Sequence, residues 1–246
     1  MSTKINKLCI LGASSDLGEA LAYRFAPEVK QLILSSRQPH KLEALKKDIT
    51  IHELGPSVEL ITVDCAAPDE AKLQQIAQQT DLVICTIGYL GDHDLAQSDA
   101  VESSRIIQAN YSGLVAILNI FARNMDQRGQ GGMIGVASVA GLRGRQSNYL
   151  YGSAKAGFIA YLSGLRNRLH AKGIHVMTVL PGFMDTQMTA HLDLPPLLTA
   201  QPKQAADRIY KAYRRRKNQV YVLGRWRWIM LVITSIPEFI FKRLRL

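Results

Sequence analysis

The chain has 246 residues, of which 47% are hydrophobic and 20% charged, so it is long enough to bury one substantial core. Its three cysteines, Cys9, Cys65 and Cys85, are far apart and lie in apolar runs, which excludes a disulfide framework and a metal site with zinc-ligand spacing. The net charge of +10 lies entirely in residues 203–246, because residues 1–202 carry 18 positive and 18 negative side chains.

Short apolar runs alternate with longer segments of helical character, which is the pattern of repeated βαβ units. Strands are expected at Lys7–Leu11, Gln31–Ser35, Val58–Val63, Leu82–Ile87, Met133–Ala137, His175–Leu180 and Val220–Leu223. Helices are expected to begin near Leu17, His40, Pro68, Gln97, Asn148 and Lys203. The pattern predicts a doubly wound α/β fold with a seven-stranded parallel sheet. The first residues lack the hydrophobic region of a signal peptide, so we expect a cytosolic protein.

The first expected strand runs into a glycine-rich turn, Gly12-Ala-Ser-Ser-Asp-Leu-Gly18, and then into an apolar helix. Glycines let the backbone approach a phosphate closely, and the N-terminus of the helix presents free N–H groups to it. This segment is consistent with dinucleotide binding and equally with a plain tight turn.

The second expected strand ends in Ser36 and Arg37, where dinucleotide folds usually place an acid that binds the ribose 2′-hydroxyl. A hydroxyl followed by a guanidinium would instead bind a 2′-phosphate, which favours NADP(H) over NAD(H). The alternative is that Arg37 is a solvated loop residue.

The residues with the most chemical content are Ser138, at the end of the fifth strand, and the segment Tyr151-Gly-Ser-Ala-Lys155 at the start of a helix. Residues four apart lie on one helix face, so the ammonium can sit near the phenol and is expected to lower its pKa. Tyr151 would then exchange the proton, and Ser138 would hydrogen-bond the reacting oxygen. Tyr149 lies on another helix face and is not expected to be the acid.

From about Lys7 to Leu223 the order of these motifs resembles the short-chain dehydrogenase/reductase family, which implies a Rossmann fold and an oxidoreductase that usually forms dimers or tetramers. The resemblance implies a catalytic tetrad of Asn110, Ser138, Tyr151 and Lys155, in which Asn110 holds a water that links Lys155 to solvent. Together with Ser36 and Arg37, the residues predicted to contact the cofactor are Gly12, Ser14, Ser15, Asp16, Leu17, Gly18, Asp64, Cys65, Gly88, Tyr151, Lys155, Pro181, Gly182 and Thr186.

Two positions depart from the family pattern. Asp16 replaces a glycine of the first motif, which puts an acid near the phosphates unless it caps the following helix. The fourth-strand motif, usually Asn-Asn-Ala-Gly, is Cys85-Thr-Ile-Gly here, so the usual asparagine contacts are absent.

Residues 184–202 show no periodicity and contain three prolines, and they follow the end of a strand, where ligands of α/β proteins bind. A substrate lid is the preferred interpretation, and an inert loop is the alternative.

The tail, residues 225–246, has an apolar run from Trp228 to Phe241 between basic residues, and this run is too short to span a bilayer. Residues 1–224 are thus expected to form the catalytic domain, and the tail to lie on an anionic membrane surface at the inner face of the cytoplasmic membrane. Trp226 and Trp228 would settle at headgroup level, and deleting the tail would leave the catalytic domain active. The alternative is that the tail packs on the domain or in a dimer contact.

The leading hypothesis is an NADP(H)-dependent ketone reductase that acts on a lipid-linked or otherwise amphipathic substrate, because the tail also resembles, more loosely, that of reductases acting on decaprenylphosphoryl keto-sugars. A reductase of small soluble carbonyls and a non-catalytic nucleotide sensor are the alternatives. Nucleic acid is not expected as a partner, because the basic residues of the tail are interleaved with bulky aliphatic ones.

Overall fold

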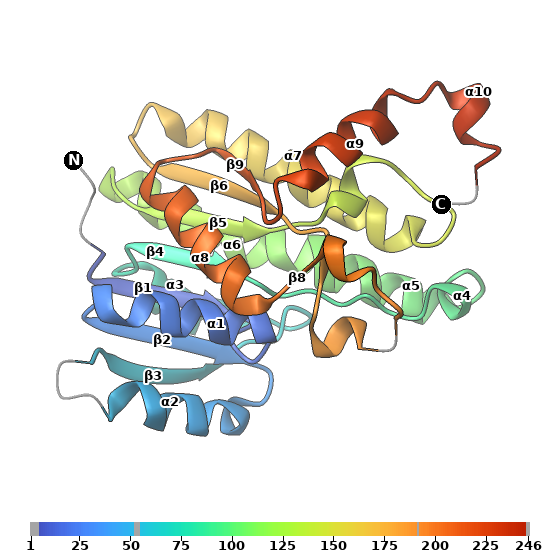
Figure 1. Cartoon of the computed structure of the whole chain (residues 1–246). Coiled ribbons are helices and arrows are strands. Elements are labelled where there is room, and N and C mark those ends of the chain that lie inside the picture. The colour runs from blue at the N-terminus through green and yellow to red at the C-terminus, as the bar shows by residue number, and fades with distance from the viewer. Residues whose placement is uncertain (1–4, 52–54, 191, 245–246) are drawn as a thin grey trace.

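The computed structural model describes residues 5–51, 55–190 and 192–244. Seven parallel strands form one sheet in the order β3-β2-β1-β4-β5-β6-β9 (Figure 1). The strands are β1 (Lys7–Leu11), β2 (Gln31–Ser36), β3 (Ser57–Thr62), β4 (Leu82–Cys85), β5 (Gly132–Val136), β6 (His175–Leu180) and β9 (Gln219–Tyr221). The seven-stranded parallel sheet expected from the sequence is confirmed, with strand ends that differ by at most two residues.

The strand order reverses between β1 and β4, which lie side by side in the middle of the sheet. The chain first builds β2 and β3 on one side of β1 and then β4, β5, β6 and β9 on the other. In open α/β sheets, ligands bind in the crevice beyond the carboxyl ends of the strands at such a reversal. The topology therefore places the expected cofactor turn, directly after β1, at this crevice.

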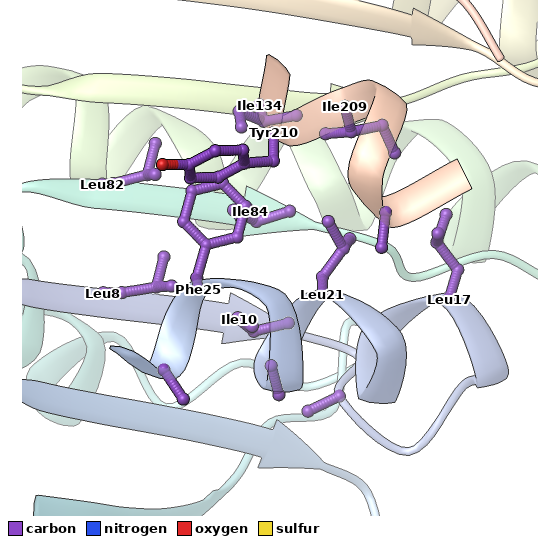
Figure 2. Packing of buried hydrophobic residues seen from close by; sticks show 14 of the residues in the cluster. Leu8, Ile10, Leu17, Leu21, Phe25, Leu82, Ile84, Ile134, Ile209 and Tyr210 are labelled. Carbon is purple, nitrogen blue, oxygen red and sulfur yellow. The ribbon is translucent and has the colours of Figure 1, made fainter. Parts of the chain in front are cut away.

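Helices cover both faces of the sheet. Alternation of side chains along β1 sends Leu8 and Ile10 into one core and Cys9 and Leu11 into the other. Figure 2 shows the first core, where Phe25 packs edge-on against Tyr210 with ring centroids 5.2 Å apart. That face carries α1 (Asp16–Phe25), α2 (Glu43–Thr50) and α8 (Pro202–Arg214), and the opposite face carries α3 (Glu70–Ala77), α6 (Gly113–Arg128) and α7 (Tyr149–His170).

The helix expected near Gln97 begins later than predicted. A short turn, α4 (His93–Ala96), comes first, and α5 (Ala100–Ile107) begins after Asp99, whose side chain accepts hydrogen bonds from two N–H groups of the first turn. Such a cap satisfies donors that have no partner within the helix. A π-helical turn, Gln108–Ser112, then joins α5 to α6.

The irregular segment after β6 contains a small second sheet that the sequence did not predict. The two-residue strands β7 (Phe183–Met184) and β8 (Thr199–Ala200) pair in parallel and hold the two ends of residues 185–198 together. Two 3₁₀ turns, Gln187–Thr189 and Pro196–Leu198, lie between these strands. We call residues 183–200 the substrate loop after the substrate lid expected there, which stays a prediction.

The tail contains two helices, α9 (Arg225–Ser235) and α10 (Glu238–Phe241). Trp226 and Met230 of α9 are buried in the core of the main domain, so the interpretation of Trp226 as a headgroup-level residue is wrong. Trp228 and Val232, on the opposite side of α9, are 64% and 65% exposed. Of the tail's predicted basic residues, Arg245 lies outside the described residues. No helix in the described part of the chain is both long and apolar enough to cross a membrane.

Candidate active site

The turn after β1 is built from two glycines that tolerate no side chain. Gly12 has φ = +85°, and a β-carbon there would lie 2.9 Å from the backbone nitrogen of Ile87, in the segment that follows β4. Gly18 packs against the backbone of Gly12 and Ala13 in the same way. Ser15 caps α1 by accepting a hydrogen bond from Gly18 N at 3.1 Å. Leu17 follows in the first turn, where backbone N–H groups have no partner within the helix.

The ends of β2 and β3 form one polar corner of this crevice. The hydroxyls of Ser14 and Ser36 are 3.0 Å apart, and Ser36 also accepts a hydrogen bond from Gln38 N. Burial raises the pKa of the Cys65 thiol, Asp64 raises it further, and the positive charge of Arg37 acts against this rise. Arg37 itself is exposed. Ser36, Arg37, Asp64 and Cys65, singled out separately in the sequence, are therefore neighbours.

Asp16 does not cap α1, because Ser15 does. Its carboxylate instead accepts a hydrogen bond at 3.0 Å from the backbone nitrogen of Gln187, 171 residues further along the chain. The acid that departs from the glycine pattern thus joins the cofactor turn to the substrate loop.

The segment after β4 passes directly over two of the predicted catalytic residues. A β-carbon at Gly88 would lie 3.3 Å from Asn110 Oδ1 and 3.4 Å from Lys155 Nζ. Asn110 is buried in the π-helical turn, a distortion often found at functional sites. Its amide donates to the carbonyl of Tyr89 at 2.6 Å and accepts from the nitrogen of Tyr89 at 3.2 Å. Asn110 therefore clamps the segment that carries Gly88.

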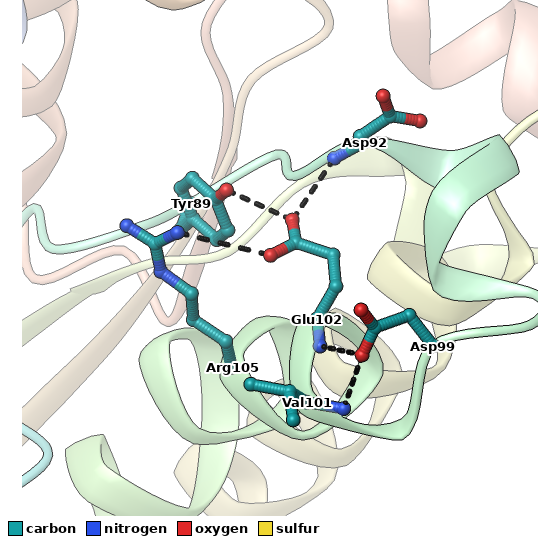
Figure 3. A network of polar contacts seen from close by, with 6 residues as sticks. All are labelled: Tyr89, Asp92, Asp99, Val101, Glu102 and Arg105. Atoms are coloured by element: carbon teal, nitrogen blue, oxygen red, sulfur yellow. Dashed lines mark hydrogen bonds and ion pairs between the residues drawn. The ribbon is translucent and has the colours of Figure 1, made fainter.

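A buried carboxylate, which the sequence did not single out, holds the same segment from the other side. Glu102 on α5 accepts hydrogen bonds from the Tyr89 hydroxyl at 2.8 Å and from Asp92 N at 3.1 Å, and pairs with Arg105 at 3.7 Å (Figure 3). The Arg105 guanidinium lies over the Tyr89 ring, 4.4 Å from its centroid. Gly91, two residues after Tyr89, has φ = +73° and no side chain, which lets the backbone pass close to Glu102 and Ile106.

Ser138, Tyr151 and Lys155 come together beyond the end of β5. Ser138 is the extended residue before the turn Val139–Leu142, and its side chain forms a hydrogen bond with Tyr151. Lys155 is buried, with Nζ 3.3 Å from the Val136 carbonyl and 5.7 Å from the centroid of the Tyr151 ring.

Burial raises the pKa of Tyr151 to about 12, and the hydrogen bond with Ser138 opposes that rise. Burial lowers the pKa of Lys155 to about 8. The pKa of Tyr151 thus moves in the opposite direction to that expected from the sequence, because desolvation of the phenol outweighs any stabilisation of the phenolate. In the protein alone, Tyr151 therefore keeps its proton at neutral pH.

The residues after β6 are positioned by the tail. A β-carbon on Gly182 would overlap the indole of Trp226, whose ring meets Phe183 edge-on with centroids 5.1 Å apart. Trp226 Nε1 donates a hydrogen bond at 3.0 Å to the carbonyl of Leu198, at the far end of the substrate loop. Pro181 is buried and accepts a hydrogen bond from Val139 N, beside Ser138. Thr186 lies further along, with its hydroxyl 3.2 Å from that of Thr189.

A cavity of about 1560 Å³ opens between these elements. Tyr151 lies in its wall, together with residues of the β4–α4 segment, of the loop before α7 and of the substrate loop, among them Tyr89, Arg145, Asn148, Phe183 and Met188. A tyrosine that holds its proton, a serine hydroxyl and a buried lysine thus lie at or next to a cavity large enough for a drug-sized molecule.

Known protein sequences are similar to most of this chain. Residues 6–195 match the sequence profile of a family described as short chain dehydrogenase. Uncharacterised oxidoreductases of Streptomyces coelicolor and Mycobacterium tuberculosis are 32% and 30% identical, each across 96% of this chain and 95% of their own length.

Solved structures show the same fold. A short-chain dehydrogenase from Sphingobium yanoikuyae, determined in complex with NADPH, is 26% identical with a TM-score of 0.83, covering 95% of this chain and 97% of its own. A bulky-bulky ketone specific alcohol dehydrogenase from Comamonas testosteroni superposes with a TM-score of 0.80 at 21% identity, across 96% of each chain.

We expect Trp226→Ala to lower the free energy of unfolding by about 3–5 kcal/mol, because it removes a buried indole packed on Gly182 and Phe183. Trp228→Ala, on the exposed side of the same helix, should change it by less than about 0.5 kcal/mol. Urea unfolding monitored by circular dichroism measures the free energy of unfolding of both variants. Equal effects of the two substitutions would contradict the role of Trp226 in the core.

Proposed function

Because the chain belongs to the short-chain dehydrogenase family, we propose that it is an NADP(H)-dependent oxidoreductase that reduces a ketone to an alcohol. The observation that carries this proposal is Tyr151, a phenol that keeps its proton at neutral pH, in the wall of the cavity with Ser138 bonded to it and Lys155 behind it. The presence of Ser138, Tyr151 and Lys155 together, with Ser138 bonded to Tyr151, argues against a non-catalytic nucleotide sensor.

The crevice at the strand reversal fits a dinucleotide. Gly12 and Gly18 leave no β-carbon above the turn, and α1 directs its N-terminus there, which suits a diphosphate. Ser14, Ser36 and Arg37 would hold a 2′-phosphate, Asp64 and Cys65 would line the adenine end, and Gly88, Pro181, Gly182 and Thr186 would line the nicotinamide end. The NADPH complex of the 26% identical Sphingobium enzyme supports this choice of cofactor. When bound, the cofactor supplies the hydride that reaches the carbonyl carbon.

The protein's own residues manage the proton. As the carbonyl carbon gains a hydride, its oxygen becomes an alkoxide, and Tyr151 gives its phenolic proton to that oxygen. Ser138 hydrogen-bonds the same oxygen and favours the developing negative charge. The phenolate left on Tyr151 is stabilised by the Lys155 ammonium, 5.7 Å from the ring centroid. Asn110, beside Lys155 under Gly88, would guide the returning proton from solvent.

An amphipathic substrate is supported by the exposed side of the tail. Trp228, Leu231, Val232 and Phe239 are each more than half exposed, and the exposed basic residues Arg225, Arg227, Lys242 and Arg243 flank them. Such a surface suits the interface of an anionic membrane, where a lipid-linked ketone would be found. The opposite side of α9 holds the substrate loop through Trp226. The alternative, a small soluble ketone, is favoured by the ion pair of Arg143 with Glu238 at 2.6 Å, which ties the tail to the domain.

Tyr151→Phe should lower kcat for ketone reduction by about a hundredfold to ten-thousandfold, because it removes the proton donor and no nucleotide contact of comparable strength. Wild-type activity should fall as the pH rises through about 8, since the buried Lys155 loses its positive charge there while Tyr151, at about 12, stays protonated. Steady-state rates measured with saturating NADPH from about pH 6 to about pH 10 report both effects. Tyr149→Phe is the matched control, and a comparable loss in that variant would show that the acid is misassigned.

NADPH should bind at least about tenfold more tightly than NADH, because Arg37 can form a charge-assisted contact to the 2′-phosphate. Arg37→Ala should remove this preference, whereas Lys41→Ala, an exposed cation on the following turn, should keep it. Isothermal titration calorimetry of the wild type and of both variants, each with NADPH and with NADH, gives the dissociation constants to be compared. Equal affinities of the wild type for both cofactors would rule out this role of Arg37.

Binding of the protein to phospholipid vesicles should require anionic lipid and weaken as salt increases, because charges on the tail are screened over about 10 Å at 0.1 M salt. Trp228→Ser and Val232→Ser should weaken flotation with vesicles without unfolding the domain, since both side chains are exposed. Val101→Ser removes an equally exposed apolar side chain from α5 and should have no effect. If the wild type ignores anionic vesicles, the membrane assignment fails and the soluble substrate is preferred.

A further inference from the structure

The cavity wall contains an arginine whose charge is not neutralised by any group that the structure describes. Arg145 lies in the loop between the turn Val139–Leu142 and α7, and its side chain is only partly exposed. Its Nε atom is buried and has no hydrogen-bond partner among the described residues. Nor does its guanidinium form an ion pair with any carboxylate in the described ranges. Burial lowers its pKa, and no nearby acid counters that effect.

Two other arginines also have pKa values lowered by burial, but their guanidinium groups form hydrogen bonds with the protein. Arg166 donates to the carbonyl of Val176 and the hydroxyl of Thr178, and Arg128 donates to three backbone carbonyls. Those contacts replace the water lost on burial. Arg128 also has a buried Nε with no partner in the described part of the chain, but its two terminal nitrogens are bonded. Within the part of the chain that the structure describes, Arg145 is the exception among these three because none of its guanidinium nitrogens has a hydrogen bond or an ion pair, and a partly buried cation without a partner is costly to keep.

The acids around the cavity do not fill this role. Asp92 accepts a hydrogen bond from Leu95 N as the cap of α4, and Asp94 accepts one from the side chain of Gln97. Asp193 lines the cavity from the substrate loop but is exposed and makes no ion pair with Arg145. The counter-charge of Arg145 is therefore missing from the described protein, and the cavity is the space that it faces.

We propose that Arg145 binds an anionic group, a carboxylate or a phosphate, carried by the ketone substrate, an assignment that rests on the proposed reductase function. A guanidinium presents paired donors that match both kinds of oxyanion. Arg145 and Tyr151 line the same cavity, so one molecule can place its carbonyl at the phenol and its anion at the guanidinium. Asn148, in the same wall, has a buried Oδ1 with no hydrogen-bond partner among the residues that the structure describes, and this atom would accept a hydrogen bond from a substrate hydroxyl.

The test compares ketones that differ only in charge. Each ketone is assayed with NADPH. The carboxylate series consists of levulinate and its longer homologues, in which the ketone stays next to the terminal methyl group. The phosphate series consists of the phosphate monoesters of the matching keto alcohols, and the uncharged methyl amides are the neutral controls. The wild type should reduce the charged member at one chain length with a kcat/KM about tenfold or more above that of its amide, chiefly through a lower KM. The carboxylate and phosphate series separate the two sources of the anion.

Arg145→Gln should bring the kcat/KM of the charged substrate down to that of its amide, so that the ratio of the two values falls to about one. Arg143→Gln removes the same charge two residues away, where Glu238 already pairs with it, and should keep the preference. The proposal is overturned if the wild type does not distinguish charged from neutral ketones, if Arg145→Gln keeps the preference, or if Arg143→Gln loses it equally.

Failure of the reductase assignment would look different from failure of this inference. If no ketone in the panel is reduced, the proposed reaction fails, and calorimetric titration of the NADP⁺ complex with levulinate and its methyl amide still tests Arg145. Tighter binding of the acid that Arg145→Gln abolishes supports the anion site, and equal binding of acid and amide overturns it.

Discussion

A cation held inside the protein, the ammonium of Lys155, is the constraint on which the geometry of the site depends. Removing such a group from water costs several kcal/mol unless acceptors surround it, and the acceptor here is the Val136 carbonyl at the end of β5. The segment after β4 passes close to this ammonium at Gly88, where a β-carbon would lie 3.4 Å from Lys155 Nζ and 3.3 Å from Asn110 Oδ1. Burial brings the pKa of Lys155 down to about 8, so the group that is costly to bury also exchanges its proton near physiological pH.

The segment after β4 shows how the same site is kept without the usual asparagines of its motif. Asn110 binds both backbone groups of Tyr89 from the π-helical turn, and Glu102 binds the Tyr89 hydroxyl and Asp92 N from α5. The two anchors lie about two turns apart in one continuous helical region. A buried carboxylate forms strong hydrogen bonds with the donors around it. The side chains of Glu102 and Asn110 therefore fix the backbone next to Lys155.

Local patterns predicted the strands and the grouping of Ser138, Tyr151 and Lys155, because parallel strands end at one edge of the sheet and residues four apart share a helix face. Contacts between distant segments were beyond those patterns. Nothing near Asp16 indicates Gln187 as its partner, and nothing near Trp226 indicates that Gly182 makes room for its ring. The pKa of Tyr151 was misjudged for a related reason, since its value depends on how deeply the surrounding fold buries the phenol. The buried carboxylate of Glu102 has no sequence signal other than an acid in the first turn of a helix.

The contact between Asp16 and Gln187 also has a bearing on the order in which the protein is made. Asp16 leaves the ribosome early, Gln187 emerges 171 residues later, and Trp226, which supports the loop after β6, later still. A nascent chain can form the β1 turn as soon as β1, β2 and β4 exist, but the contact of that turn with Gln187, and the support of the loop by Trp226, must wait until these later residues are synthesised. Contacts of such long sequence separation close slowly, because the intervening chain must be ordered first. Fragments that stop before Trp226 would thus lack the indole that packs on Gly182 and Phe183 and binds the Leu198 carbonyl.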